Sequence, residues 1–299
     1  MARNKEWQGK TGGGSLGQKA LFFYFTYGSI AISYAIVSVV ILFYLAIHYK
    51  ATKNIYQYFR KRQHFGICKS MLSTYRNHYL FGKSLIDKFA MFAGRRKEYS
   101  VTVIGQEYFD EVVDNPEKGA IILNSHVGSI EIVGYFFNQK KKKLHAIVFG
   151  GESAELQKQR DKILTEHNVY MIPVVDGFSH VFAVNNALKE KDLVGMAGDR
   201  VYEGSKNASV HFMGSPAQFP MSSFQLAVKL KAPMLAMFVM QSGYKKYTCY
   251  VYKIEVENLE TYTQQQQIEL LMQKYASIIE KILEMYPLQW YNFYDFWKN

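Results

Sequence analysis

Hydrophobic positions divide this chain of 299 residues into two parts with different periodicities. An unbroken apolar run covers residues 21–47. From there to about Gly94, apolar and aromatic residues recur at spacings of three and four, with lysines and arginines between them. After Gly94, short aliphatic runs alternate with amphipathic stretches. The first pattern predicts helices, and the second predicts strands and helices in alternation.

The alternating part predicts an α/β fold with a mostly parallel central sheet flanked by helices. The predicted strands are residues 101–104, 120–123, 144–149, 169–174, 193–197, 234–240 and 248–254. The predicted helices are residues 130–138, 153–167, 178–190, 222–230 and 261–285. A run of four glutamines, residues 264–267, falls inside the last of these helices.

The apolar run of about 27 uncharged residues predicts an N-terminal membrane-anchoring helix. Such a helix would be about 40 Å long, whereas the hydrocarbon of a bilayer is about 30 Å thick. Tyr24, Tyr27, Tyr44 and Tyr49 lie toward its ends, where interfacial rings settle. No small-residue cleavage site follows, which argues against a signal peptide. The alternative is a helical hairpin that is buried in the domain or lies in the interface.

These patterns divide the chain into an anchor over residues 1–50 and a domain over residues 51–299, whose α/β core begins at residue 95. Residues 51–94 predict basic, aromatic helices that lie on an anionic membrane surface. Ordinary amphipathic helices packing on a core fit the same pattern equally well.

The formal net charge is +11 and the pI is about 9.3, so an acidic partner is expected. No zinc-finger spacing, RNA-binding aromatic motif or basic heptad segment is present, which favours a membrane or an acidic carrier protein over nucleic acid. The two cysteines, Cys68 and Cys249, are far apart in sequence and fit a reducing compartment.

The candidate chemistry lies in "NSHVGSIEI", residues 124–132, directly after a predicted strand. Residues five apart on a regular helix do not face each other, so His126 and Glu131 can meet only if His126 precedes the helix and Glu131 is in its first turn. Gly128 permits the tight turn, and Ser129 is a natural N-cap. A carboxylate bonded to one ring nitrogen would raise the basicity of the other.

Such a histidine can take a proton from an alcohol or amine as it attacks an acyl carbon. Backbone N–H groups from Val127 through Gly128 to Ser129 are candidates for binding the oxyanion. A serine hydrolase lacks its Gly-x-Ser-x-Gly turn here. No His-Glu-x-x-His pair is present, so no metal site is predicted.

Four stretches carry a resemblance to a known family. They are "FGKSLIDKFAMFAG", "GAIILNSHVGSIEI", "GMAGDRVYEGSKNASVHFMGSPAQFP" and "YPLQWYNFYDFW". With the N-terminal hydrophobic segment, they extend through nearly the whole chain. The chain resembles the lipid A biosynthesis acyltransferases of the lauroyl/myristoyl type, within the lysophospholipid acyltransferase superfamily. Its second stretch is similar to the family's His-x-x-x-x-Glu block.

The resemblance implies that His126 and Glu131 form the catalytic dyad. It also implies that Asp199 and Arg200 belong to the charged substrate site, and that Arg160 matches the family's arginine before the following strand. From the residues alone, Asp199 and Arg200 could be an ordinary surface pair and Arg160 a solvated helix residue. The C-terminal aromatic residues could be core or an interfacial belt beside the active site.

The prediction is therefore a membrane-bound acyltransferase that moves a fatty acyl chain from a thioester of acyl-carrier protein or coenzyme A to a lipid hydroxyl or amine. The acceptor is a lipid A precursor or another lysolipid. A thioester is already activated, so no cofactor is required. The resemblance implies the bacterial inner membrane, with the active site on the cytoplasmic side. The alternatives are a non-enzymatic protein that binds anionic lipid and a lipid hydrolase.

Overall fold

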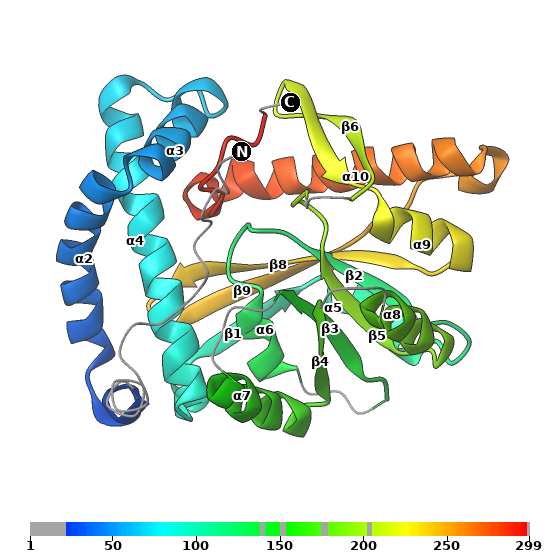
Figure 1. Cartoon of the computed structure of the whole chain (residues 1–299), viewed down its shortest axis with the longest axis horizontal. Helices are drawn as coiled ribbons and strands as arrows, with labels where there is room; N and C mark the ends of the chain where they lie inside the picture. Colours follow the sequence, from blue (N-terminus) through cyan, green and yellow to red (C-terminus); the bar gives the residue numbers. More distant parts are fainter. Residues whose placement is uncertain (1–21, 138–140, 150–153, 175–178, 202–204, 298–299) are drawn as a thin grey trace.

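A seven-stranded sheet forms the centre of the molecule, with helices on both faces (Figure 1). The structure, a computed structural model, describes residues 22–137, 141–149, 154–174, 179–201 and 205–297. The strands of the sheet, in chain order, are β1 (Ser100–Ile104), β2 (Ala120–Asn124), β3 (Leu144–Phe149), β4 (Val169–Val174), β5 (Leu193–Ala197), β8 (Met234–Gly243) and β9 (Lys246–Lys253). Their order across the sheet is β1-β9-β8-β2-β5-β3-β4.

Five strands run in one direction, and β1 and β9 run in the other, because β9 pairs antiparallel with β8 and parallel with β1. The other neighbouring pairs are all parallel. All seven predicted strands are strands of this sheet, and the predicted α/β class is confirmed. In β2 the whole segment Ala120–Leu123 is buried, as expected for a central strand covered on both faces.

The helices of the α/β part are α5 (Gln106–Asp114), α6 (Glu131–Phe136), α7 (Ala154–Glu166), α8 (Ser179–Lys189), α9 (Ser222–Leu230) and α10 (Gln264–Met285). Helices α5, α6 and α7 contribute to a core on one face of the sheet, and α8, α9 and α10 to a core on the other. Alternate residues of β2 divide between these cores, Ile122 to the first and Leu123 to the second. The glutamine run opens α10, where Thr263 and Gln266 form a capping box.

The sequence prediction missed α5 and a small antiparallel hairpin. The hairpin consists of β6 (Asn207–Phe212) and β7 (Ser215–Pro220). Its two loop residues, Met213 and Gly214, both have positive φ (49° and 78°), which suits the right-handed twist of a two-residue hairpin.

The N-terminal helices are α2 (Ile30–Ile47), α3 (Tyr49–Lys61) and α4 (Ile67–Phe92). The predicted single helix over residues 21–47 is interrupted: residues 22–27 are helical, and α2 begins anew after Ser29, whose side chain caps it. Figure 1 shows α2 beside α4 at one side of the molecule. In α3, Ile55, Tyr58 and Phe59 belong to the core, so this helix packs as part of the domain.

Among the described residues, α2 is the helix that is long and apolar enough to cross a membrane. Length and composition alone also fit the core helix of a soluble protein, but only 22% of α2 is buried inside the molecule. Its composition therefore favours contact with lipid, and its orientation depends on how the rest of the protein holds it.

Candidate active site

His126 and Asp199 meet at the carboxyl ends of two neighbouring parallel strands. Asn124 at the end of β2 pairs with Ala197 at the end of β5, and each functional residue follows its strand end by two positions. The chain then enters helices on opposite faces of the sheet, α6 after β2 and, beyond the β6–β7 hairpin, α9 after β5. Strand ends of this kind border a crevice where ligands bind in α/β folds.

One carboxylate holds both the ring and the backbone of His126. Nδ1 of His126 lies 2.9 Å from Oδ1 of Asp199, and the His126 N–H donates to Oδ2 of Asp199 over 2.8 Å. The Asp199 side chain is only 4% exposed, whereas that of His126 is 31% exposed. Asp199 therefore orients the imidazole from the protein side and leaves the ring reachable from solvent.

The charge state of Asp199 follows from its surroundings. Burial acts to raise its pKa, but the charge of His126, two hydrogen bonds from His126 and the nearby charge of Arg200 together lower the pKa below the ordinary value. Asp199 is thus ionised at neutral pH. An ionised acceptor at Nδ1 favours the tautomer that carries its proton there, which leaves Nε2 as the basic nitrogen.

Tyr275 of α10 fixes the ends of β2 and β5 from the face of the sheet that α8, α9 and α10 cover. Its hydroxyl donates to the Asn124 carbonyl oxygen over 2.6 Å, and the Gly198 N–H donates to the same oxygen over 2.9 Å. A Cβ at Gly198 would lie 2.9 Å from the Tyr275 ring, so this position has no room for a side chain. The packing of Gly198 against Tyr275 sets the approach of Asp199 to His126.

The turn after His126 is held by main-chain bonds. The N–H groups of Val127, Gly128 and Ser129 donate to Ser125 Oγ (3.2 Å), the Gln289 carbonyl (2.7 Å) and the Val239 carbonyl (2.7 Å). These are the N–H groups that the sequence offered for the oxyanion, and each already has an acceptor within the protein. Their observed role is to hold the loop.

Gly128 makes this turn possible, as the sequence predicted. Its φ is +74°, and a Cβ there would lie 2.3 Å from the Val239 carbonyl oxygen. Ser129 does not cap the helix as predicted, because α6 begins one position later with Ile130 at its N-cap. The Ser129 hydroxyl is buried and has no hydrogen-bond partner among the described residues.

Glu131 lies in the first turn of α6, as predicted, but its side chain contacts α4. It forms an ion pair with Lys88, and it is 62% exposed. No hydrogen bond or ion pair joins Glu131 to His126 in the described part of the chain. The structure therefore brings His126 together with Asp199, and Glu131 together with Lys88.

The two predicted arginines have different surroundings. The Arg200 guanidinium lies 5.3 Å from the centre of the Tyr294 ring, and its buried Nε lacks a partner among the described residues. Arg200 follows Asp199 directly and thus belongs to the same strand end. Arg160 lies on α7, where its contacts include an ion pair with the adjacent Asp161 at 3.3 Å.

The C-terminal segment holds the His126 loop through main-chain contacts that the sequence prediction missed. The Gln289 side chain bonds both main-chain groups of Gln241, accepting from its N–H and donating to its carbonyl, each at 2.8 Å. The Gln289 carbonyl receives the Gly128 N–H, and the Tyr291 N–H donates to the His126 carbonyl over 2.8 Å. Nothing in the local sequence around Gln289 signals these contacts, because Gln241 and Gly128 are distant from it in the chain.

The C-terminal aromatic residues include core positions. Trp290, Tyr291 and Phe296 are buried, and Trp290 pairs with Val127 next to His126. From α4, the Asn77 side-chain amide donates to the Trp290 carbonyl over 2.8 Å. The segment therefore lies between α4 and the His126 loop and holds them together.

A cavity of about 660 Å³ lies at the far end of α6. Its lining includes Tyr135 and Phe136 of α6, the cationic side chains Arg96 and Lys97, and His167. None of the predicted site residues lines it. In the part of the chain that the structure describes, no three His, Cys, Asp or Glu side chains group in a way that would hold a metal ion.

The fold and the strand-end pair define an α/β protein with a partly exposed histidine ring oriented by a buried carboxylate. The family comparison makes this specific: the model of the bacterial lipid A biosynthesis acyltransferases matches residues 77–299. The match covers well over half of the chain, and the protein belongs to this family. Membership implies acyltransferase activity, with an acyl donor and a lipid acceptor. No curated protein matches the chain significantly in sequence.

Proposed function

We propose that this protein transfers a fatty acyl chain from an acyl thioester to a hydroxyl or amine of a membrane lipid, with His126 as general base. The observation that carries the proposal is the pair of bonds from the buried Asp199 to His126, at 2.8 and 2.9 Å. It holds Nδ1 and leaves Nε2 for the substrate. The family match supports acyl transfer as the reaction.

In the proposed reaction, His126 Nε2 takes the proton of the acceptor hydroxyl or amine while its oxygen or nitrogen attacks the thioester carbonyl carbon. The tetrahedral intermediate collapses as the carbon–sulfur bond breaks. The imidazolium returns the proton to the leaving thiolate, so the products are the acylated lipid and a free thiol. Asp199 stabilises the imidazolium that forms between these steps.

Glu131 remains a proposed catalytic residue. Its carboxylate is exposed in the first turn of α6, near the loop that carries His126. To orient His126 as the sequence predicted, it would have to leave Lys88 and take the place of Asp199 at Nδ1. The proposal therefore assigns the orienting role to Asp199 and places Glu131 at the substrate-facing entrance to the loop.

Binding of the acceptor is assigned to groups with unused hydrogen-bonding capacity. The buried Arg200 Nε and Ser129 Oγ lack partners among the described residues, and a guanidinium suits a phosphate or carboxylate of a lipid head group. The Ser129 hydroxyl takes the oxyanion role first assigned to the backbone N–H groups of Gly128 and its neighbours. Arg160 is proposed to contact the acceptor from α7.

The proposed donor is acyl-carrier protein or acyl coenzyme A, both of which are acidic and suit a net charge of +11. Because both donors are cytoplasmic, the site is proposed to face the cytoplasm at the bacterial inner membrane. The acceptor is a lipid A precursor or another lysolipid. The apolar α2 supports attachment to the membrane.

The test is incubation of the purified protein with labelled acyl thioester and a bacterial lipid extract. We expect a labelled lipid product, and we expect His126→Ala to lower turnover about 10²- to 10⁴-fold, the usual loss on removing a general base. Free fatty acid as the sole product would indicate a hydrolase. No turnover, with retained binding to anionic vesicles, would indicate a lipid-binding protein. A His126→Ala variant with more than a tenth of wild-type turnover would remove His126 from the mechanism.

A further inference from the structure

Helix α2 is fastened along its length to α4. Its inward face includes the buried residues Ser33, Tyr34 and Ile41. Midway along, α4 carries Gly82, where a Cβ would lie 2.9 Å from Val37 Cγ2, so the two helices are in close contact there. The side of α2 that faces the domain is therefore covered by α4.

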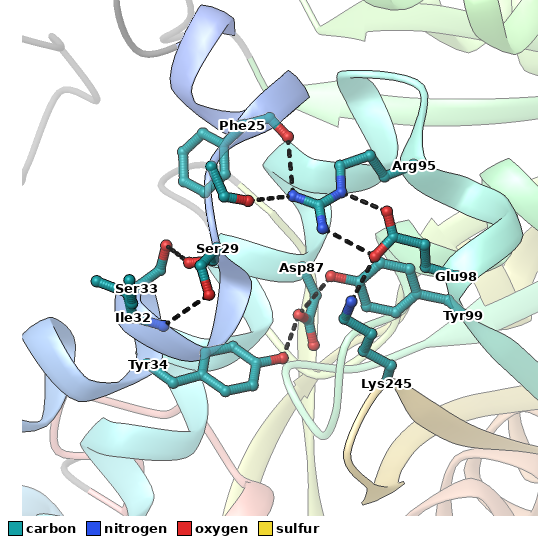
Figure 2. Close-up of polar contacts among 11 residues, drawn as sticks. Phe25, Ser29, Ile32, Ser33, Tyr34, Asp87, Arg95, Glu98, Tyr99 and Lys245 are labelled. Carbon is teal, nitrogen blue, oxygen red and sulfur yellow. Dashed lines mark hydrogen bonds and ion pairs between the residues drawn. The ribbon is translucent and has the colours of Figure 1, made fainter.

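The deepest attachment of α2 is a hydrogen bond to a buried carboxylate (Figure 2). The Tyr34 hydroxyl donates to Asp87 of α4, which has no exposed surface. Asp87 also accepts hydrogen bonds from Tyr99 at 2.9 Å, from Tyr247 of β9 and from the Gln241 amide of β8 at 3.2 Å. Removing α2 would take one hydrogen-bond partner from a buried carboxyl group, which is costly. Asp87 therefore joins α2 to the sheet through α4.

A second attachment holds the chain just before α2. The Arg95 guanidinium donates to the Gly28 carbonyl over 2.6 Å and also reaches the Phe25 carbonyl. Glu98 holds the other side of this guanidinium, and Lys245 pairs with Glu98. Figure 2 shows this cluster next to the Asp87 cluster, so both the start and the body of α2 are tied to the α/β domain.

The outward face of α2 is apolar and uncovered. The large apolar side chains of α2 that are between 50% and 76% exposed are Ile32, Ile36, Val39, Val40, Leu42, Phe43 and Ile47. The first turns of α4 add Ile67, Met71 and Leu72, each at least 56% exposed. Many large apolar side chains exposed on neighbouring helices of a folded protein mark a contact with another apolar phase or partner.

The charge of this part of the chain favours an anionic lipid surface as the partner. Between residues 22 and 86 the chain contains no Asp or Glu. The same stretch contains eight cations, namely Lys50, Lys53, Arg60, Lys61, Arg62, Lys69, Arg76 and Lys83. Each lysine or arginine near an anionic leaflet contributes roughly 1 kcal/mol of attraction. Exposed apolar helix faces in a segment rich in cations are typical of helices that lie in the membrane interface.

The attachments exclude a simple crossing of the bilayer by α2. If α2 crossed the hydrocarbon layer, α4 would have to enter the layer beside it. Asp87 would then lie inside the layer, together with Arg76, Lys83 and Lys88 of α4. The charged cluster around Arg95 would follow, since it binds the start of the helix. Charged side chains in the hydrocarbon are expensive unless they line a cavity.

We propose that α2 does not span the membrane but lies, docked on α4, in one leaflet of an anionic bilayer with both of its ends on the same side. Its outward face enters the acyl chains, and the basic residues of α3 and α4 meet the lipid head groups. The proposal deepens the membrane attachment of the proposed function but does not depend on acyl transfer. In this arrangement α4 connects α2 to the site, because Asn77 of α4 bonds Trp290 and Trp290 pairs with Val127 next to His126.

Docking is tested by cross-linking in native membranes, in a Cys68→Ser background because Cys68 is exposed and Cys249 is buried. The pair Val37→Cys with Gly82→Cys should form a disulfide on mild oxidation, since the two positions are in contact. The matched control carries Ile36→Cys, Gly82→Cys and Val37→Ala. Val37→Ala leaves room for the new side chain at Gly82, and Ile36→Cys puts the second thiol on the outward face of α2. Equal cross-linking of both pairs, or none in membranes, would overturn the docked arrangement.

Sidedness is tested independently with single cysteines at Tyr27→Cys and Tyr49→Cys, positions that are 74% and 69% exposed at the two ends. The protein is reconstituted into sealed vesicles of phosphatidylethanolamine and phosphatidylglycerol, and it is labelled with a membrane-impermeant maleimide before and after permeabilisation. We expect both positions to show the same accessibility. Labelling of only one end before permeabilisation would establish a spanning helix. Because labelling reads topology alone, loss of acyl transfer in any variant would not affect this result.

Discussion

At the scale of single residues, Asp199 supplies the partner that the sequence assigned to Glu131. Its two oxygens bond the His126 ring and backbone separately, and it is buried, whereas Glu131 is exposed and paired with Lys88. We expect Asp199→Asn to lower kcat about 10³- to 10⁴-fold with little change in KM, because an amide at Nδ1 favours the wrong tautomer.

Glu131→Gln is the matched comparison, since it makes the same carboxylate-to-amide change at the exposed position. Its main structural effect is loss of the Lys88 ion pair, and such exposed pairs contribute at most about 1 kcal/mol to stability. We expect a smaller loss of kcat than for Asp199→Asn, measured as initial rates at saturating donor and acceptor. A loss as large as that of Asp199→Asn would restore Glu131 as the group that orients His126.

Asp199 also predicts how stability depends on pH. Its pKa is lowered in the folded protein, so its ionised form is favoured by folding. The resulting stability is present above the unfolded pKa, about 3.9, and is lost as the pH falls through the lower folded pKa. We expect the difference in melting temperature between wild type and Asp199→Asn to shrink from pH 5 downward. A difference that stays constant between pH 7 and pH 3.5 would contradict this assignment.

At the scale of elements, Gln289 joins the C-terminal segment to β8 and to the His126 loop. We expect Gln289→Leu to lower both the melting temperature and kcat, because it leaves the buried main-chain groups of Gln241 without partners. Each buried group left unpaired costs about 1–3 kcal/mol. The His126 loop, which bonds the Gln289 carbonyl, then loses its support.

The chain offers a matched control for Gln289. The Gln273 side chain makes the same two bonds to the main chain of His211, at 2.9 and 2.8 Å, on the exposed side of α10. Gln273→Leu should leave kcat unchanged and lower stability less. If Gln289→Leu lowered the melting temperature but kept wild-type kcat, Gln289 would be a stabilising residue without a role in positioning His126.

At the scale of the whole molecule, α2 belongs to the fold rather than to a detachable anchor. Deleting residues 1–47 removes the Tyr34 bond to Asp87 and exposes the face of α4 around Gly82. We expect the truncated protein to melt at a lower temperature than the full chain in the same detergent and to aggregate when the detergent is removed. A soluble, monodisperse truncated protein with an unchanged melting temperature would show that α2 contributes nothing to the fold.

Local pattern was enough to predict the sheet, its class and the position of His126. Alternating aliphatic and amphipathic runs predict the seven strands. A central strand is buried on both faces, so its consecutive residues are all apolar, as in Ala120–Leu123. The turn at Gly128 could likewise be predicted, since a positive φ favours glycine. The β6–β7 hairpin and the break before α2 depend on turn residues. Turn residues predict structure less strongly than the periodic spacing of hydrophobic residues does.

Only the tertiary structure decided which groups surround His126 and how α2 is held. Asp199 is 73 positions away in the chain and reaches the imidazole because β2 and β5 are neighbours in the sheet. Strand order depends on long-range pairing, which no local pattern encodes. In the same way, an apolar helix by itself fits an anchor or a core element. The bond from Tyr34 to the buried Asp87 decides that α2 is docked, because the energy of a buried carboxyl group depends on the hydrogen bonds it makes.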